Sequence, residues 1–182
     1  MTEAEFCDAL IEEMRSTIEA IGPERVACFI GEPIQGSGGV IVPPAGYHRR
    51  SLELCHSYGI LYISDEVVTA FGRLGHMIAS KARFGITPDI ITCAKGLTSG
   101  YVPLAATIMS DRIHEVLSAP GAYFNNGFTY SGHPVACRAA LKNIEIIERE
   151  KLCERVVRLG PLLGEVLEPL RELPLVGDVR GS

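Results

Sequence analysis

Apolar positions recur at helical spacing near both ends of the chain. At the start, Phe6, Leu10, Met14, Ile18 and Ile21 follow a capping-box pattern at 2–5, and the sequence GP at 22–23 ends the helix. A second helical segment begins at Pro134 and carries a stripe at Ala136, Ala140, Ile144 and Ile147. A third is expected over about 152–173, with an interruption at 160–161, because glycine followed by proline disfavours a helix interior.

Four short apolar runs between these helices predict strands at 26–30, 60–64, 90–94 and 104–109. Helices are expected over about 48–58 and 78–84, so strands and helices alternate as in a mostly parallel sheet. The first run suits a strand buried on both faces, and Cys28 and Cys93 are expected to be buried thiols within their runs. The link from the third run to the fourth is too short for a parallel crossover, so the fourth strand is predicted to be antiparallel.

Composition and charge narrow the possible functions. The chain is 47% hydrophobic and 21% charged, which is typical of a soluble globular protein. A net charge of -5 argues against a nucleic-acid partner, so small-molecule partners are expected. The six cysteines and five histidines have no ligand-like spacing, and no metal site is expected. The chain has no signal-peptide pattern and no apolar run long enough for a bilayer, so we expect no membrane association and a cytoplasmic location.

Polar residues stand at the carboxyl ends of the apolar runs, where open α/β sheets bind ligands. These residues are Glu32, Asp65 and Lys95. If the second and third strands are neighbours, Asp65 and Lys95 emerge side by side. Pyridoxal phosphate requires such a pair, because its aldehyde forms a Schiff base with a lysine while a carboxylate keeps its ring nitrogen protonated. The lysine can then also act as the base that moves the Cα proton. The alternative is a structural ion pair or two solvated loop charges.

Four segments carry a family resemblance: 32–36 (EPIQG), 65–73 (DEVVTAFGR), 94–97 (AKGL) and 127–134 (GFTYSGHP). In this order and spacing they resemble class III aminotransferases, and most of all the ω-amino acid and amine transaminase branch, over essentially the whole chain. The resemblance implies an α/β fold that is part of the large domain of PLP-dependent transferase fold type I. The expected sheet is mostly parallel and incomplete, with one antiparallel strand and flanking helices. It also implies transfer of an amino group from an amine or ω-amino acid to a 2-oxo acid such as pyruvate.

The resemblance assigns a role to several residues. Lys95 matches the lysine that forms the Schiff base, Asp65 the partner of the pyridinium nitrogen, and Val67 the apolar residue on one ring face. Thr129 resembles a threonine that reaches the cofactor phosphate from the neighbouring subunit, with a backbone N–H supplied by Phe128, which implies a homodimer with a shared active site. A polar turn before the helix at Pro134 is the competing interpretation of this segment.

One further residue has two interpretations, and two others depart from the family pattern. Glu32 resembles a glutamate that, in some members, pairs with an arginine during substrate exchange, and the competing interpretation is a loop-capping carboxylate. Ala70 stands where glycine is more common in the family, which puts the local turn in question. Val68 stands where some members have glutamine, which disfavours a γ-aminobutyrate-type enzyme.

Family members are considerably longer, so the chain is interpreted as a central fragment. Residues 1–172 are expected to be part of the large PLP-binding domain, and 173–182 the start of a small C-terminal domain. An isolated fragment would bind the cofactor weakly and turn over little. A non-catalytic remnant of such an enzyme and a PLP-dependent aminomutase of the same family are the alternative functions.

Overall fold

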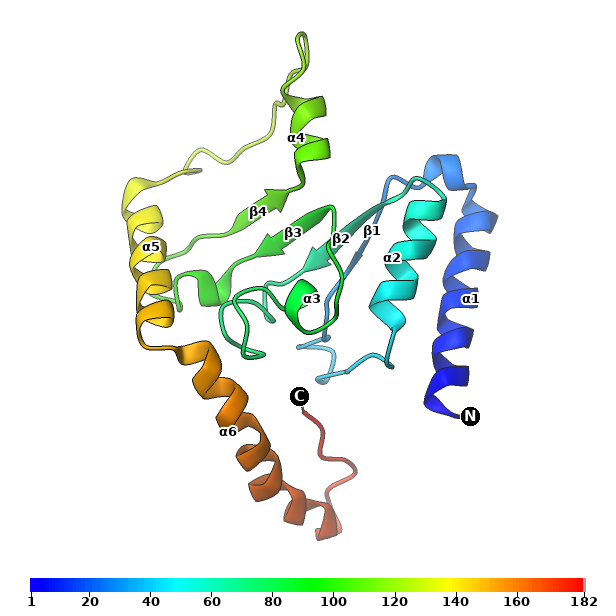
Figure 1. Cartoon of the computed structure of the whole chain (residues 1–182), viewed down its shortest axis with the longest axis vertical. Coiled ribbons are helices and arrows are strands. Elements are labelled where there is room, and N and C mark those ends of the chain that lie inside the picture. The colour runs from blue at the N-terminus through cyan, green and yellow to red at the C-terminus, as the bar shows by residue number, and fades with distance from the viewer. Residues whose placement is uncertain (182) are drawn as a thin grey trace.

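A computed structural model describes residues 1–181 and shows one four-stranded sheet with helices around it (Figure 1). The strands lie in chain order and are β1 (Cys28–Gly31), β2 (Leu61–Asp65), β3 (Ile90–Cys93) and β4 (Ala106–Met109). The first three are parallel, and β4 is antiparallel to β3. The predicted α/β class, with a mostly parallel sheet and one antiparallel strand, is therefore confirmed. The short link before β4 leaves room for a turn but not for a crossover helix.

The helices flank this sheet and continue beyond it. They are α1 (Glu3–Ile21), α2 (Tyr47–Ser57), α3 (Ala79–Ala82), α4 (Asp111–Leu117), α5 (Pro134–Arg149) and α6 (Leu152–Leu167). Three short 3-10 helices are η1 (Pro23–Arg25), η2 (Lys95–Leu97) and η3 (Glu168–Glu172). No helix within residues 1–181 is both long enough and apolar enough to cross a membrane.

The start of α1 is fixed by the predicted capping box. The Thr2 hydroxyl accepts from the Glu5 N–H at 3.2 Å, and the Glu5 carboxylate accepts from the Thr2 N–H at 2.7 Å. The buried face differs by one position in the first turn, where Cys7 is buried and Phe6 is 47% exposed. The buried positions Cys7 and Ile11 are therefore shifted by one residue from the predicted stripe, which the helix meets again at Ile18.

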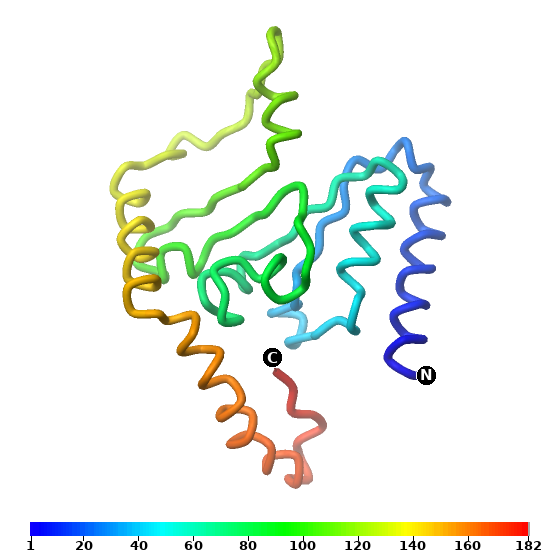
Figure 2. The backbone as a smooth tube through the Cα atoms, in the orientation of Figure 1, coloured from blue at the N-terminus to red at the C-terminus, as the bar shows by residue number. Residues whose placement is uncertain are grey.

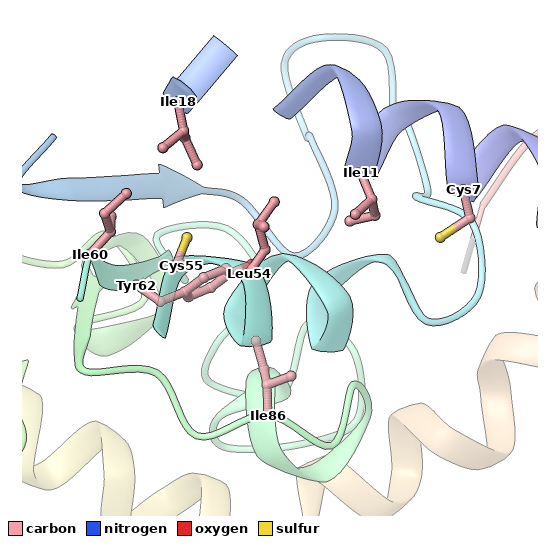
Figure 3. Packing of buried hydrophobic residues seen from close by; sticks show 8 residues of the cluster. All are labelled: Cys7, Ile11, Ile18, Leu54, Cys55, Ile60, Tyr62 and Ile86. Carbon is pink, nitrogen blue, oxygen red and sulfur yellow. The ribbon is translucent and has the colours of Figure 1, made fainter. Parts of the chain in front are cut away.

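The hydrophobic core lies between α1, α2 and the sheet. Tyr62 on β2 is 1% exposed and stacks in a tilted geometry on Phe29 of β1, with ring centroids 5.3 Å apart. Figure 3 shows the buried cluster, which comprises Cys7, Ile11, Ile18, Leu54, Cys55, Ile60, Tyr62 and Ile86. Burying each large apolar side chain contributes roughly 1.5–3 kcal/mol, so this cluster, through Tyr62, anchors β2, one of the two strands whose ends form the candidate site.

Two predictions about burial were wrong. The first strand is not buried on both faces, because Ile30 is 56% exposed and Cys28 is also exposed. In the described part of the chain, β1 is an edge strand that pairs only with β2, so fewer elements cover it. Cys93 lies on the inner strand β3 and is buried, as predicted.

The predicted interruption near Pro161 is absent. Helix α6 continues through Pro161 as far as Leu167, and η3 follows it directly. Proline removes one hydrogen bond of the helix ladder, and because α6 has no buried residue, water can satisfy the carbonyl that is left free. Beyond η3 the backbone up to residue 181 is irregular (Figure 2), and Ser182 of the expected small-domain segment lies outside the described residues.

Candidate active site

The strands β2 and β3 bring two of the predicted residues to the same edge of the sheet. Asp65 ends β2 and lies opposite Thr92 in the parallel register, and Lys95 follows the end of β3 at Cys93. Both strands point toward the side where α5 stands (Figure 1). The carboxylate and the amine therefore emerge at the carboxyl ends of adjacent parallel strands, where α/β sheets bind their ligands.

The loop after β2 fixes the backbone around Asp65. Its Oδ1 accepts a hydrogen bond from the Val67 N–H at 3.0 Å, which leaves its other oxygen without a partner within residues 1–181. Val67 itself is half-buried, two residues further along the same turn. Ala70 is buried and is not among the residues of positive φ, so alanine is compatible with this turn.

Glu66, next to Asp65, is a fully buried carboxylate that the sequence reasoning did not single out. It is 0% exposed and accepts hydrogen bonds both from the turn after β2 and from the start of α3. The donors are the N–H groups of Ala79 and Ser80, at 2.9 and 2.6 Å, and the hydroxyls of Thr69 and Ser80. Because four donors converge on it, Glu66 ties the turn after β2 to the start of α3 and holds Asp65 in place.

Lys95 has the opposite environment. Its side chain is exposed, and within residues 1–181 the amine forms no hydrogen bond or ion pair. Its backbone φ is 31°, in the left-handed region that side chains rarely adopt. The turn is closed by the Leu97 N–H, which donates to the Ala94 carbonyl at 2.7 Å. An uncommitted amine on a strained turn is available to react with a ligand.

Two glycines allow the motif segments to pack directly on one another. A Cβ added at Gly96 would lie 2.9 Å from the Cβ of Phe71, and one at Gly36 would lie 3.3 Å from the side chain of Val68. The segments that carry Lys95 and Glu32 therefore both contact the turn that follows Asp65. Three of the four motif segments form one unit at this edge of the sheet.

The segment of Glu32 is held by a buried histidine and by Glu32 itself. The Glu32 carboxylate accepts from the Gly36 N–H at 3.0 Å, which is the contact expected for a loop-capping carboxylate. His48 on α2 lies 2.8 Å from the Pro33 carbonyl through Nε2 and 3.0 Å from the Tyr62 hydroxyl through Nδ1. Since a carbonyl can only accept, Nε2 carries the proton and Nδ1 accepts from Tyr62.

The directions in which burial shifts the pKa of these two residues agree with that assignment. Burial lowers the pKa of His48, against the opposing effect of its hydrogen bond to Pro33, and burial raises the pKa of Tyr62. The ring therefore stays neutral and the phenol stays protonated. The pair is a rigid support for the loop of Glu32.

The fourth motif segment is not brought to this edge within one chain. Phe128 is 88% exposed and its N–H donates to the Ser131 hydroxyl at 2.9 Å, while Thr129 is also exposed. Figure 2 shows this stretch running as an irregular arm between α4 and α5. The expected contact of Phe128 and Thr129 with the cofactor phosphate in a neighbouring subunit stays a prediction.

Asn143 on α5 is a second residue that sequence reasoning missed. Its amide nitrogen donates to the carbonyls of Gly96 at 2.8 Å and of Leu97 at 3.1 Å. It occupies a place between Ala140 and Ile147 on the buried stripe of α5, where a polar side chain is unusual. That break in the apolar stripe is the signal that could have identified it.

Within residues 1–181 no group of three or more His, Cys, Asp or Glu residues could hold a metal ion. The edge of the sheet offers instead an unpaired amine, a carboxylate with one free oxygen and an apolar side chain. These groups fit a cofactor that reacts with an amine and carries an aromatic nitrogen.

Several characterised or named proteins resemble this chain over nearly its full length. It is 47% identical to a probable aminotransferase of Mycobacterium tuberculosis, over 98% of this chain and 38% of the relative. It is 46% identical to a putrescine–pyruvate aminotransferase of Pseudomonas aeruginosa, over 100% of this chain and 40% of the relative. A γ-aminobutyrate transaminase of Solanum lycopersicum is 43% identical, over 99% of this chain and 35% of the relative. The chain thus spans less than half of the length of these relatives.

Solved structures show the same relationship. An (S)-enantioselective ω-transaminase from Thermomicrobium roseum superposes with a TM-score of 0.96 at 49% identity, covering 100% of this chain and 40% of that one. An amine transaminase from an uncultivated Pseudomonas species, solved in its PLP-bound form, has a TM-score of 0.94 at 44% identity, with coverage of 100% and 41%. The sequence model of the class-III aminotransferases matches residues 1–182, and the chain belongs to that family.

Proposed function

We propose that this chain is part of a pyridoxal-phosphate-dependent aminotransferase that transfers an amino group from an amine or ω-amino acid to a 2-oxo acid such as pyruvate. The observation that carries the proposal is the parallel register of β2 and β3, with Asp65 and Lys95 at their adjacent carboxyl ends. Membership of the class-III family supports it, because class-III aminotransferases depend on this cofactor. Residues 1–172 would then belong to the large cofactor-binding domain and 173–182 to the start of a small domain.

In this proposal Lys95 has two roles at its Nζ atom. Its exposed and uncommitted amine would hold the cofactor covalently, and the same Nζ, when free, would remove and return the Cα proton of the substrate. When bound, pyridoxal phosphate supplies an electron-withdrawing ring that stabilises negative charge at the substrate carbon. Oδ2 of Asp65 would keep the ring nitrogen of the cofactor protonated, because Oδ1 is already occupied by the Val67 N–H.

Other residues would orient the cofactor and the substrate. Val67 would pack on one face of the cofactor ring. Thr129 and the backbone N–H of Phe128 would bind the phosphate of the cofactor held by a neighbouring copy, and the active protein would then be a homodimer. The exposure of Phe128, at 88%, supports a role outside its own chain. The Phe128 N–H would have to leave the Ser131 hydroxyl to reach a phosphate. Glu32 contributes to the substrate side and would have to leave the Gly36 N–H to do so.

The amino donor is proposed only as a class. Relatives of this chain are named for putrescine with pyruvate and for γ-aminobutyrate, so both diamines and ω-amino acids fit the family. Val68 by itself does not exclude a γ-aminobutyrate-type donor, because a relative named as a γ-aminobutyrate transaminase is 43% identical to this chain.

The first test is to add pyridoxal phosphate to the purified protein and to record the visible absorbance of the lysine-bound cofactor. The second is to measure the transfer of an amino group from each of a panel of amines to pyruvate. We expect the absorbance in the wild-type protein and in Lys81→Ala, which removes an exposed lysine of α3, and its loss in Lys95→Ala. Absorbance that survives in Lys95→Ala would refute the assignment. Lys95-dependent absorbance without amino transfer would favour the non-catalytic remnant, and conversion of one amine into an isomer would favour an aminomutase.

A further inference from the structure

The turn after β3 contains two residues in a backbone conformation that side chains disfavour. Lys95 has a φ of 31° and Ser99 a φ of 50°, with Gly100 following at 77°. Non-glycine residues remain in this region only where the surrounding structure holds them. The contacts that hold residues 95–99 therefore determine where the Lys95 amine is presented.

One side of this turn is supported by the loop that follows β2. Gly96 packs so closely on that loop that an added Cβ would lie 2.9 Å from the Cβ of Phe71 and 3.4 Å from the carbonyl oxygen of Ala70. This contact prevents the turn from moving toward β2. It does not prevent movement in the opposite direction, toward α5.

The other side is held by the side chain of Asn143. Its Nδ2 donates to the carbonyls of both Gly96 and Leu97, at 2.8 and 3.1 Å, and its Oδ1 accepts from the Ser99 hydroxyl at 2.8 Å. The orientation of the amide is unambiguous, because a carbonyl can only accept and must face the NH2 group. A single side chain thus spans the turn from the residue after Lys95 to Ser99, the second strained position.

Neighbouring residues on α5 do not share this role. Lys142 forms an ion pair with Glu145 at 2.6 Å, and both side chains are more than half exposed. Asn143 is half-buried and uses all three of its contacts on the 95–99 turn. It contacts a turn that is distant in sequence, since Asn143 and Gly96 are separated by 47 positions.

We propose that Asn143 is a positioning residue for Lys95, which holds the strained turn in the conformation that presents the lysine amine to the cofactor. The inference rests on the proposed function, in which Lys95 is the attachment point. Asn143→Asp keeps the size of the side chain but puts an oxygen against two carbonyl oxygens, so both donated hydrogen bonds are lost and repulsion replaces them. Ser99→Ala removes only the third contact and is the milder variant.

The experiment measures how selectively pyridoxal phosphate attaches to Lys95. The chain has four lysines, at 81, 95, 142 and 151, and all of them are exposed. Because Lys142 is next to Asn143 and forms an ion pair with Glu145, only Lys81 and Lys151 serve as reporters of unselective attachment. The protein is mixed with a limiting amount of the cofactor, reduced with borohydride after short times, and digested for mass mapping. The measured quantity is the initial rate at Lys95 divided by the mean rate at Lys81 and Lys151, recorded together with the melting temperature.

We expect this ratio to be well above one in the wild-type protein. It should be about tenfold lower in Asn143→Asp and about two- to threefold lower in Ser99→Ala, because misplacing a reacting group by a fraction of an ångström has effects of this order. Glu145→Gln, on the exposed face of α5, should leave the ratio unchanged. A merely structural role of Asn143 would lower the melting temperature and leave the ratio at the wild-type value, which would overturn the inference alone. A wild-type ratio near one would overturn the proposed function, and the inference with it.

Discussion

Glu66→Gln exchanges one atom of a fully buried side chain and tests whether the loop after β2 depends on its carboxylate. In the wild-type protein Oε1 accepts from the Ser80 N–H and hydroxyl, and Oε2 accepts from the Ala79 N–H and the Thr69 hydroxyl. Glutamine turns one of these oxygens into an NH2 group. A hydroxyl can rotate and accept from it, but a backbone N–H cannot.

In either orientation of the new amide, one backbone N–H, of Ala79 or of Ser80, therefore faces another donor. An unsatisfied buried donor costs about 1–3 kcal/mol, and the remaining hydrogen bonds lose the strength that a charged acceptor gives them. We expect Glu66→Gln to lower the free energy of unfolding by about 2–4 kcal/mol. For a chain of this size that corresponds to a decrease in Tm of about 4–16 °C.

The assay is thermal unfolding followed by circular dichroism at neutral pH. The matched control is Glu115→Gln, which makes the same exchange at an exposed position of α4 and should change stability by less than about 0.5 kcal/mol. A Glu66→Gln protein that melts together with this control would refute the reasoning. It would mean that the four donors are satisfied by other acceptors.

Two further perturbations test the supports of the site. Gly96→Ala puts a methyl group 2.9 Å from the Phe71 Cβ. We expect this variant to destabilise the protein by about 1–3 kcal/mol and to slow cofactor attachment. The control is Gly177→Ala, whose methyl group would have no atom within 4 Å and should have neither effect. Equal melting of the two variants would contradict the close packing. Burial lowers the pKa of His48, so below about pH 6.5 the unfolded chain takes up a proton that the folded protein refuses. The free energy of unfolding of the wild-type protein should therefore decrease as the pH is lowered from about 6.5 to the pKa of His48 in the folded state. In His48→Gln the decrease should be smaller. If the free energy of unfolding depends on pH equally in both proteins, His48 is not the cause.

The parts of the fold that depend on chain length and local pattern could be predicted from the sequence. The capping box at Thr2 set the start of α1, and the short link after Lys95 required an antiparallel β4. The placement of Asp65 and Lys95 at one edge followed from the same reasoning, since parallel neighbouring strands end on the same side.

Features that depend on distant contacts could not be predicted. Helix α4 was missed because its short sequence carries no clear apolar stripe, and its first residues are held by Ser110 carbonyl contacts and by an ion pair from Arg112 to Asp89 at 2.8 Å. The burial of Glu66 has no local signal in the sequence, because its donors, Thr69 and Ser80, lie at the two ends of a long turn. Asn143 acts on a turn far away in sequence, which no local pattern reveals.

The most direct test of the central claim is to identify the lysine that carries pyridoxal phosphate after the purified protein has been saturated with added cofactor. Reduction with borohydride, digestion and mass mapping distinguish the four lysines of the chain without ambiguity. The account predicts a single modified residue, Lys95, beside Asp65 at the carboxyl end of the parallel strands. Modification at Lys81, Lys142 or Lys151 in its place, or at no lysine, would contradict it.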